Sequence, residues 1–184
     1  MSGRGSGKVV VLDRDGTIVI DRGYADDAAT LEFAPGAAEG LRSLHVGGYR
    51  LMVITNQSGV GRGLFALERV HQMNARLEVM VREAGARLER IYFCPHAPEA
   101  GCACRKPAGA LLAQAAADLR FDPAAAVVIG DKESDIEFGR RAGATTILIA
   151  AERPSPAARF QPDFVAPDLM AAAHQLMQLR SAAG

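Results

Sequence analysis

The sequence predicts an α/β protein with a Rossmann-like parallel sheet and helices on both faces. Short, continuous apolar runs rich in β-branched residues alternate with segments whose apolar residues recur at helical spacing. Continuous apolar runs are typical of strands that are buried on both faces of a parallel sheet. Their alternation with helices predicts right-handed crossovers between neighbouring parallel strands.

The expected strands and helices follow one another along the chain. Strands are expected where a short apolar run ends in polar residues, at residues 8–12, 49–54, 88–93, 126–130 and 145–150. Helices are expected where the apolar spacing is helical, at residues 36–45, 66–84, 107–119, 133–141 and 168–179. We expect a loop or small hairpin at residues 17–33, a flexible loop at residues 59–63, and a packing segment at residues 163–165.

Length and charge balance limit the class of protein. With 184 residues and 49% hydrophobic content, the chain can bury one core, so we expect a single domain over residues 1–184 with residues 1–7 as a polar tail. Lys plus Arg equals Asp plus Glu at 21 each, so no excess positive charge is available to bind nucleic acid or anionic lipid. No apolar run reaches the roughly 18 residues of a membrane span. We expect a cytoplasmic protein that acts as a monomer.

Polar side chains follow three of the expected strands at the point where each strand ends. In open α/β sheets, ligands bind at the carboxyl ends of the strands, so these side chains should converge on one crevice. A glycine after the first pair of acids permits the tight turn that lets both approach one phosphorus atom. The residues are Asp13 and Asp15, Thr55 and Asn56, and Asp131 and Asp135.

This pattern suits phosphoryl transfer. A carboxylate that attacks a phosphate meets charge repulsion, which a divalent cation and a second positive charge must offset. Asp131 can complete an oxygen site for Mg²⁺, and Lys106 can supply the second charge. Asp13 would attack, and Asp15 would protonate the leaving alkoxide and then take a proton from water. Taken singly, each acid could instead be a helix cap or a solvated turn.

The three cysteines and one histidine lie together in one short stretch, which predicts a metal site. Cys94, His96, Cys102 and Cys104 offer three thiolates and an imidazole, matching a closed, tetrahedral, structural Zn²⁺ site. Bound zinc would pin the loop and fix residues 105–106 beside the crevice. The alternative is three reduced cysteines packed in a loop, because the one-residue gaps are shorter than usual finger spacing.

The acidic and basic motifs together resemble a known family. Residues 13–17, Thr55 with Asn56, Lys106 and residues 130–135 resemble, in order and spacing, the four motifs of haloacid dehalogenase-like phosphatases. The resemblance covers essentially the whole chain. It implies that Asp13 is the nucleophile and that Mg²⁺ is held by Asp13, by the backbone carbonyl of Asp15 and by Asp131.

The cysteine loop narrows this resemblance. Its Cys-Pro-His and Cys-x-Cys-Arg-Lys-Pro segments are similar to those of a small branch with minimal caps, which contains heptose-bisphosphate and histidinol-phosphate phosphatases. Residues 21–24 and 55–63 look more like the heptose-bisphosphate group, which implies a small phosphorylated sugar as substrate and a role in lipopolysaccharide precursor synthesis. The implied substrate contacts are Asp13, Arg14, Asp15, Asp21, Arg22, Gly23, Tyr24, Thr55, Asn56, Gln57, Ser58, Arg105, Lys106 and Lys132.

Other functions stay open at this point. The short spacing from His96 to Cys102 is also seen in histidinol-phosphate phosphatases, and Ala103 replaces an Asp often found between the last two cysteines. The second phosphate of a heptose bisphosphate would be bound by cations such as Arg105 or Arg62. The amine and imidazole of histidinol phosphate would instead be bound by acidic residues. The basic residues of this sequence fit the heptose bisphosphate better. A catalytically silent binding module and phosphoryl transfer to an acceptor other than water are the remaining alternatives.

Overall fold

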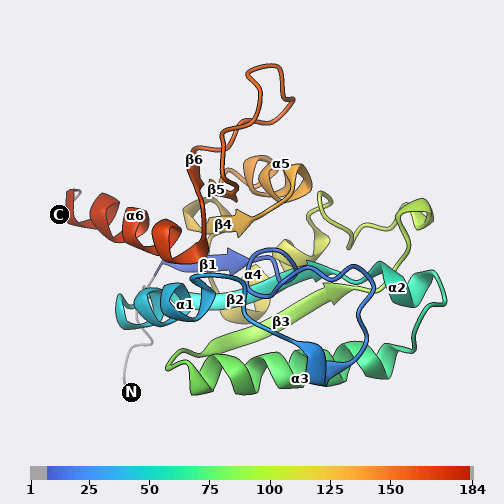
Figure 1. The fold of residues 1–184 in the computed structure, drawn as a ribbon. Coiled ribbons are helices and arrows are strands. Elements are labelled where there is room, and N and C mark those ends of the chain that lie inside the picture. The colour runs from blue at the N-terminus through green and yellow to red at the C-terminus, as the bar shows by residue number, and fades with distance from the viewer. Residues whose placement is uncertain (1–7, 183–184) are drawn as a thin grey trace.

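The computed structural model describes residues 8–182 and confirms the α/β fold class (Figure 1). Its six strands form one sheet in the order β3-β2-β1-β4-β5-β6, and every neighbouring pair is parallel. The chain builds outward from β1 on one side and from β4 on the other, as in doubly wound sheets. The strands are β1 (Val9–Leu12), β2 (Arg50–Asn56), β3 (Leu88–Cys94), β4 (Val127–Gly130), β5 (Thr145–Ile149) and β6 (Phe164–Ala166).

Helices cover both faces of this sheet. Buried residues of α1, α3 and α6 pack in one apolar layer, and those of α4 and α5 pack in the other. The helices are α1 (Ala37–Val46), α2 (Ser58–Gly61), α3 (Leu67–Glu83), α4 (Ala110–Leu119), α5 (Glu133–Arg141) and α6 (Leu169–Ala182). Short 3-10 helices occupy Ala28–Thr30, Pro98–Ala100 and Pro123–Ala125. Among the described residues, every helix is too short or too polar to cross a membrane.

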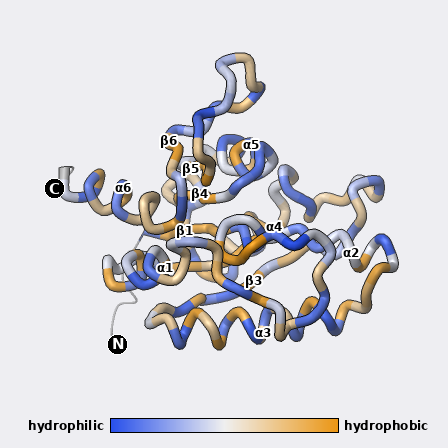
Figure 2. Tube along the Cα trace, viewed as in Figure 1, coloured by the Kyte–Doolittle hydropathy of each residue, from blue (hydrophilic) through white to orange (hydrophobic). Residues whose placement is uncertain are grey.

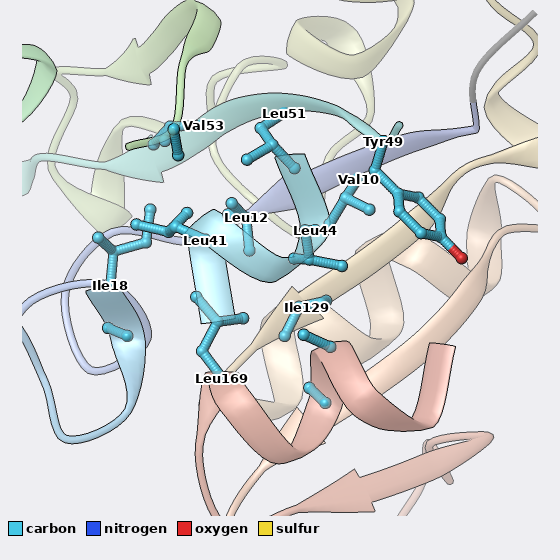
Figure 3. Packing of buried hydrophobic residues seen from close by; sticks show 14 of the residues in the cluster. Val10, Leu12, Ile18, Leu41, Leu44, Tyr49, Leu51, Val53, Ile129 and Leu169 are labelled. Atoms are coloured by element: carbon cyan, nitrogen blue, oxygen red, sulfur yellow. The ribbon is translucent and has the colours of Figure 1, made fainter. Parts of the chain in front are cut away.

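The two apolar layers form because successive residues of a strand face opposite sides of the sheet. Val10 and Leu12 of β1 pack against Leu44 of α1 in the layer that Figure 3 shows. Val9 and Val11 of the same strand belong to the opposite layer. This explains the continuous apolar run of β1, whereas the surface helix α3 alternates between apolar and polar residues (Figure 2).

The structure differs from the sequence prediction most clearly at three places. Residues 164–166 form β6, which pairs with β5, where the sequence predicted only a packing segment. The expected flexible loop at 59–63 begins within α2. The helix expected from residue 107 begins at Ala110, because residues 105–108 form a turn in which the Ala108 amide donates to the Arg105 carbonyl (2.8 Å). The predicted tail at residues 1–7 lies outside the described residues.

Candidate active site

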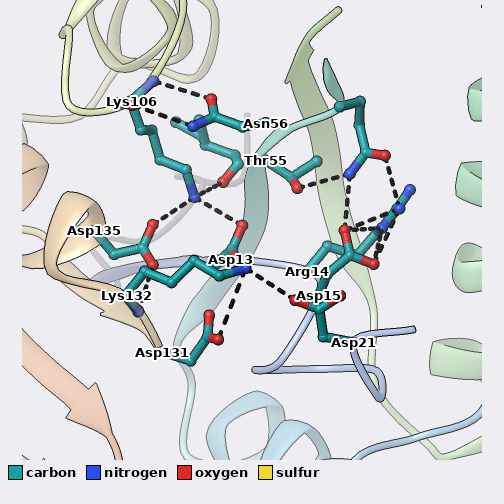
Figure 4. Close-up of polar contacts among 12 residues, drawn as sticks. Asp13, Arg14, Asp15, Asp21, Thr55, Asn56, Lys106, Asp131, Lys132 and Asp135 are labelled. Atoms are coloured by element: carbon teal, nitrogen blue, oxygen red, sulfur yellow. Dashed lines mark hydrogen bonds and ion pairs between the residues drawn. The ribbon is translucent and has the colours of Figure 1, made fainter. Parts of the chain in front are cut away.

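Acidic side chains converge at the carboxyl ends of β1 and β4, as predicted (Figure 4). Asp13 follows β1 and Asp131 follows β4, and the two strands are neighbours in the sheet. The Asp13 amide extends their pairing by donating to the Ile129 carbonyl (2.9 Å). Carboxylate oxygens of Asp13, Asp131 and Asp135 all lie within 4.8 Å of one another. The fold therefore builds an oxygen cluster of the kind that divalent cations bind.

Gly16 makes room for this cluster. Its φ of +86° lies in the left-handed region, and a Cβ at this position would lie only 2.2 Å from Asp131 Oδ2. Gly16 lies within a turn that is closed by the Arg14 carbonyl, which accepts from the amides of Ile18 (2.9 Å) and Val19 (3.0 Å). The glycine of the first motif is therefore required both by backbone conformation and by the approach of a carboxylate from a distant strand.

Asp131 carries the features expected of a cation ligand. Its Oδ1 atom is buried and has no hydrogen-bond partner among the described residues. Burial raises the pKa of Asp131 to about 6; Lys132 opposes this shift, and the negative charges of Asp13 and Asp135 reinforce it. A bound cation would satisfy the unpaired oxygen and offset the clustered negative charge. The residues thus fit Mg²⁺, which prefers oxygen ligands.

Lys106 is buried beside the Asp13 carboxylate. Its ammonium donates to Asp13 Oδ1 (2.7 Å) and to the Ile54 carbonyl (2.6 Å), and it pairs with Asp135 Oδ1 at 2.7 Å. Burial opposes its charged form, but the two carboxylates outweigh this and raise the pKa of Lys106. Asn56 holds the lysine backbone, accepting from its amide (3.0 Å) and donating to its carbonyl (3.1 Å). A fixed positive charge therefore stands next to the proposed nucleophile.

Asp135 has a larger structural role than the sequence indicated. It is 1% exposed in the first turn of α5, and its Oδ2 accepts from the Lys132 amide (3.1 Å) while Oδ1 pairs with Lys106. Burial raises the pKa of Asp135, and Lys106 opposes that shift. Gly130 permits this packing, because a Cβ there would lie 2.4 Å from the aspartate side chain.

The Asp15 side chain points away from the acidic cluster. It accepts from Gln57 Nε2 (2.8 Å), it contacts the Arg14 guanidinium at 2.9 to 3.2 Å, and its side chain is 21% exposed. Gln57 Nε2 also donates to Thr55 Oγ1 (3.0 Å). The two carboxylates of the first motif therefore have different surroundings, which suits two different chemical roles.

A pocket of about 370 Å³ lies beside Asp13, Lys106 and Asp135 and is lined by most of the predicted substrate contacts. At its mouth, Lys132 Nζ pairs with Asp21 Oδ2 at 3.0 Å, which joins α5 to the loop after β1. Burial works against the charged form of Asp21, but the Gly23 amide and Lys132 outweigh it and lower its pKa. The predicted residues that line the pocket are Asp13, Asp15, Asp21, Gly23, Tyr24, Thr55, Asn56, Gln57, Ser58, Arg105, Lys106 and Lys132.

Two predicted contacts lie outside the pocket lining. Arg14 is 2% exposed and its guanidinium faces protein groups, while Arg22 pairs with Glu32 at 2.8 Å. Conversely, four residues that were not among the predicted substrate contacts also line the pocket, although Asp135 was expected in the crevice: Gly59, Phe65, Ser134 and Asp135. Ser134 and Asp135 lie within the fourth motif, so the motif itself could have indicated them. Gly59 and Phe65 reach the pocket only through the folding of the loop after β2, which the sequence does not specify.

The predicted zinc ligands come together beside the pocket. Cys104 Sγ lies 3.0 Å from Cys94 Sγ and 3.1 Å from His96 Nδ1, and Cys102 Sγ lies 3.5 Å from Cys94 Sγ. All four ligand atoms lie within 4.8 Å of one another, and the cysteines form no disulfide. Burial raises the pKa of Cys94 to about 12, so a metal would have to displace its proton. The cluster could hold a tetrahedral zinc ion.

Comparisons with known proteins agree with this geometry. A family model described as HAD-hydrolase-like matches residues 103–172. The chain is 43% identical over 148 residues to a D-glycero-beta-D-manno-heptose-1,7-bisphosphate 7-phosphatase of Helicobacter pylori, covering 80% of this chain and 85% of that protein. It is 36% identical over 154 residues to the protein of the same name from Pasteurella multocida, covering 80% and 84%.

Solved structures extend the likeness to the fold. A D,D-heptose 1,7-bisphosphate phosphatase from B. bronchiseptica, complexed with magnesium and phosphate, matches with a TM-score of 0.82 and 27% identity, covering 94% of this chain and 99% of that one. The corresponding protein from Burkholderia thailandensis has a TM-score of 0.69 and 29% identity, covering 92% and 98%. This chain therefore belongs to the haloacid dehalogenase-like hydrolases, in the family of heptose-1,7-bisphosphate 7-phosphatases.

Proposed function

We propose that this protein removes the 7-phosphate of D-glycero-D-manno-heptose 1,7-bisphosphate through an aspartyl-phosphate formed on Asp13. The observation that carries the proposal is the position of the Asp13 carboxylate at the floor of the pocket. This carboxylate accepts from the buried ammonium of Lys106 and belongs to the oxygen cluster that Asp131 completes. The family relationship favours a heptose bisphosphate over histidinol phosphate.

The first half-reaction uses the two carboxylates in separate roles. The free electron pair of an Asp13 oxygen attacks phosphorus, while Lys106 and the Thr55 hydroxyl bind the non-bridging oxygens. The bond from phosphorus to the sugar oxygen breaks, and the carboxyl of Asp15 donates its proton to that oxygen. When bound between Asp13, Asp131 and the Asp15 carbonyl, Mg²⁺ would reduce repulsion between the nucleophile and the phosphate.

The second half-reaction returns the chain to its starting state. Asp15, now ionised, takes a proton from water as that water attacks phosphorus, and the Asp13 carboxylate leaves. Inorganic phosphate departs, and Asp15 is protonated for the next cycle. A single carboxyl group thus serves as acid and then as base, which its partial exposure in the pocket permits.

The rest of the pocket has the charge that a second phosphate requires. Arg105 and Lys132 line it in addition to Lys106, and the Arg105 guanidinium reaches the His96 carbonyl at 3.4 Å. We propose that these two cations bind the phosphate that is not cleaved. We also propose that zinc, held by Cys94, His96, Cys102 and Cys104, fixes the loop that carries Arg105. A cytoplasmic location and a monomeric state stay predictions from the sequence.

The proposal is tested by measuring phosphate release from heptose bisphosphate and from histidinol phosphate, side by side with Mg²⁺ present. We expect a strong preference for the sugar. Asp13→Asn should abolish release, since an amide cannot attack phosphorus. Asp122→Asn is the matched control, because this exposed residue caps a 3-10 helix away from the pocket and Asn caps equally well.

Two results would contradict the proposal in different ways. A preference for histidinol phosphate would overturn the substrate. Full activity of Asp13→Asn would overturn the mechanism, provided circular dichroism shows that both variants fold as the parent does.

A further inference from the structure

A buried guanidinium lies directly behind the acid and base of the proposed reaction. Arg14 is 2% exposed, and its Nε donates to Asp15 Oδ1 (3.2 Å) and Oδ2 (3.1 Å). Its Nη2 donates to Asp15 Oδ1 (3.1 Å) and to Gln57 Oε1 (2.9 Å). All these donors face protein atoms and none lines the pocket. The Arg14 guanidinium therefore acts on Asp15 and Gln57, and it does not face the pocket.

Asn74 fixes the far side of the guanidinium. It lies on α3 and is 8% exposed, among the apolar residues Val70, Met73 and Leu77 that form the buried face of the helix. Its Oδ1 accepts from Arg14 Nη1 at 3.3 Å, a contact between residues 60 apart in sequence. A polar side chain on an otherwise apolar face needs such a partner. Through this bond, a long helix supports a loop at the active site.

We infer that Arg14, held by Asn74, is a positioning residue that keeps the Asp15 carboxyl aimed at the leaving oxygen. The planar fork of a guanidinium fixes a carboxylate more narrowly than a single ammonium can. Gln57 adds a third restraint, because it bonds both Asp15 Oδ2 and Thr55 Oγ1. The inference rests on the proposed function only through the acid role of Asp15, and it is independent of which sugar is the substrate.

This role predicts a dependence on the leaving group. A good leaving group such as p-nitrophenolate departs without a proton, whereas phenolate gains much more from a general acid. Values of kcat/KM for the two aryl phosphates report the steps up to phosphoryl transfer, so the later base role of Asp15 does not enter. If Asp15 is wrongly oriented, kcat/KM should therefore fall much more for phenyl phosphate than for p-nitrophenyl phosphate.

The test compares Asn74→Leu, which keeps the side-chain size but removes the acceptor, with the parent protein. We expect kcat/KM to fall about tenfold or more on phenyl phosphate and by less than about threefold on p-nitrophenyl phosphate. Arg14→Lys keeps the charge but loses the fork, so it should show the same selectivity. Gln72→Leu, at an exposed position on the same helix, should match the parent on both substrates.

Asp15→Asn separates this inference from the proposed function. If Asp15→Asn shows no leaving-group selectivity, the proposed acid role fails. If Asp15→Asn is selective but Asn74→Leu and Arg14→Lys lose activity equally on both substrates, the contacts serve stability and the inference fails. An unaltered Arg14→Lys would also overturn it, because charge alone would then suffice. If Asn74→Leu does not fold, the kcat/KM values of Arg14→Lys on the same two substrates test the inference alone.

Discussion

The chemistry of this site depends on a few side chains whose surroundings are unlike those of a protein surface. Lys106 is 5% exposed and Asp13 is 6% exposed, and each satisfies the other's charge. A buried charge without a partner is strongly destabilising, so the two residues act as one buried ion pair. Gly16 and Asp131 depend on each other sterically, because the absence of a side chain at Gly16 makes room for the Asp131 carboxylate.

Gly16→Ala should weaken Mg²⁺ binding severely. The added Cβ would lie 2.2 Å from Asp131 Oδ2, so the carboxylate must leave the cluster. Gly63→Ala is a matched control, because Gly63 also has positive φ (+69°) but its Cβ would meet nothing within 4 Å. Both variants should lose about 1 kcal/mol of stability from backbone strain, whereas calorimetric titration should show lost Mg²⁺ affinity only for Gly16→Ala. Equal Mg²⁺ affinity in the two variants would contradict this account.

The raised pKa of Asp131 predicts how Mg²⁺ affinity changes with pH. Its value of about 6 means that the metal must displace a proton in more acidic solution. The affinity should fall about tenfold per pH unit below pH 6 and level off above it, as followed by calorimetric titration. An affinity already level at pH 5 would count against this assignment.

The raised pKa of Asp131 also affects the folding stability of the metal-free protein. Stability should fall as pH rises, whereas Mg²⁺ affinity should increase. Because the folded protein binds this proton more tightly than the unfolded chain, whose value is near 3.8, the contribution of Asp131 to stability is lost as pH rises from about 4 to about 6. Asp131→Asn should remove that part of the pH dependence in thermal unfolding.

At the residue scale, the sequence could predict which side chains follow buried strands. Asp13, Asp15 and Asp131 were predicted in this way, and the structure brings Asp13 and Asp131 into one carboxylate cluster, whereas their catalytic roles stay predictions. Asn74 was not predicted, because on α3 it resembles any polar residue of an amphipathic helix and only the fold brings it to Arg14. The direction of a side chain depends on tertiary neighbours that no local pattern specifies.

At the level of elements, the loop with the cysteines is tied to the end of β2 and to α2. The Gln57 amide donates to the Cys94 carbonyl (2.7 Å) and the Gly61 amide to the Pro95 carbonyl (2.8 Å). A Cβ on Gly61 would lie 2.3 Å from the Ala97 amide nitrogen. These contacts explain why a segment with two glycines in four residues, and therefore little helix propensity, forms α2.

Cys104→Ser should remove the proposed zinc and impair catalysis. We expect one zinc per chain in the parent protein by atomic absorption, and less than that in the variant, because serine is a poor zinc ligand. A loosened loop would also misplace Arg105 and Lys106, so kcat/KM should fall about tenfold or more. Ala103→Ser alters an exposed residue of the same loop and should retain zinc and activity. A parent protein without zinc would refute the assignment.

The prediction of elements succeeded where hydrophobic pattern was strong. The runs that became β1, β2 and β4 were long enough to identify, whereas β6 spans only Phe164–Ala166 and its pairing with β5 decides its conformation. The start of α4 was misplaced because Pro107 suits the first turn of a helix, but here it belongs to a preceding turn.

For the whole molecule, the order of strands is what creates the site. Since β1 and β4 are neighbours, residues far apart in sequence meet at one edge of the sheet, and β2 brings Thr55 and Asn56 to the same edge. Sequence predicted a parallel sheet, and right-handed crossovers limited its topologies. The order itself followed from packing between helices and sheet, which spacing alone does not encode.

The central claim is that Asp13 accepts the phosphoryl group, and trapping the phosphorylated protein tests it most directly. In Asp15→Asn, p-nitrophenyl phosphate should still phosphorylate Asp13, because this leaving group needs no acid, while hydrolysis stalls without the base. Mass spectrometry of the acid-quenched protein should find one phosphoryl group on the peptide containing Asp13, and none in the Asp13→Asn, Asp15→Asn double variant. A phosphoryl group on another residue, or equal labelling of both variants, would contradict the account.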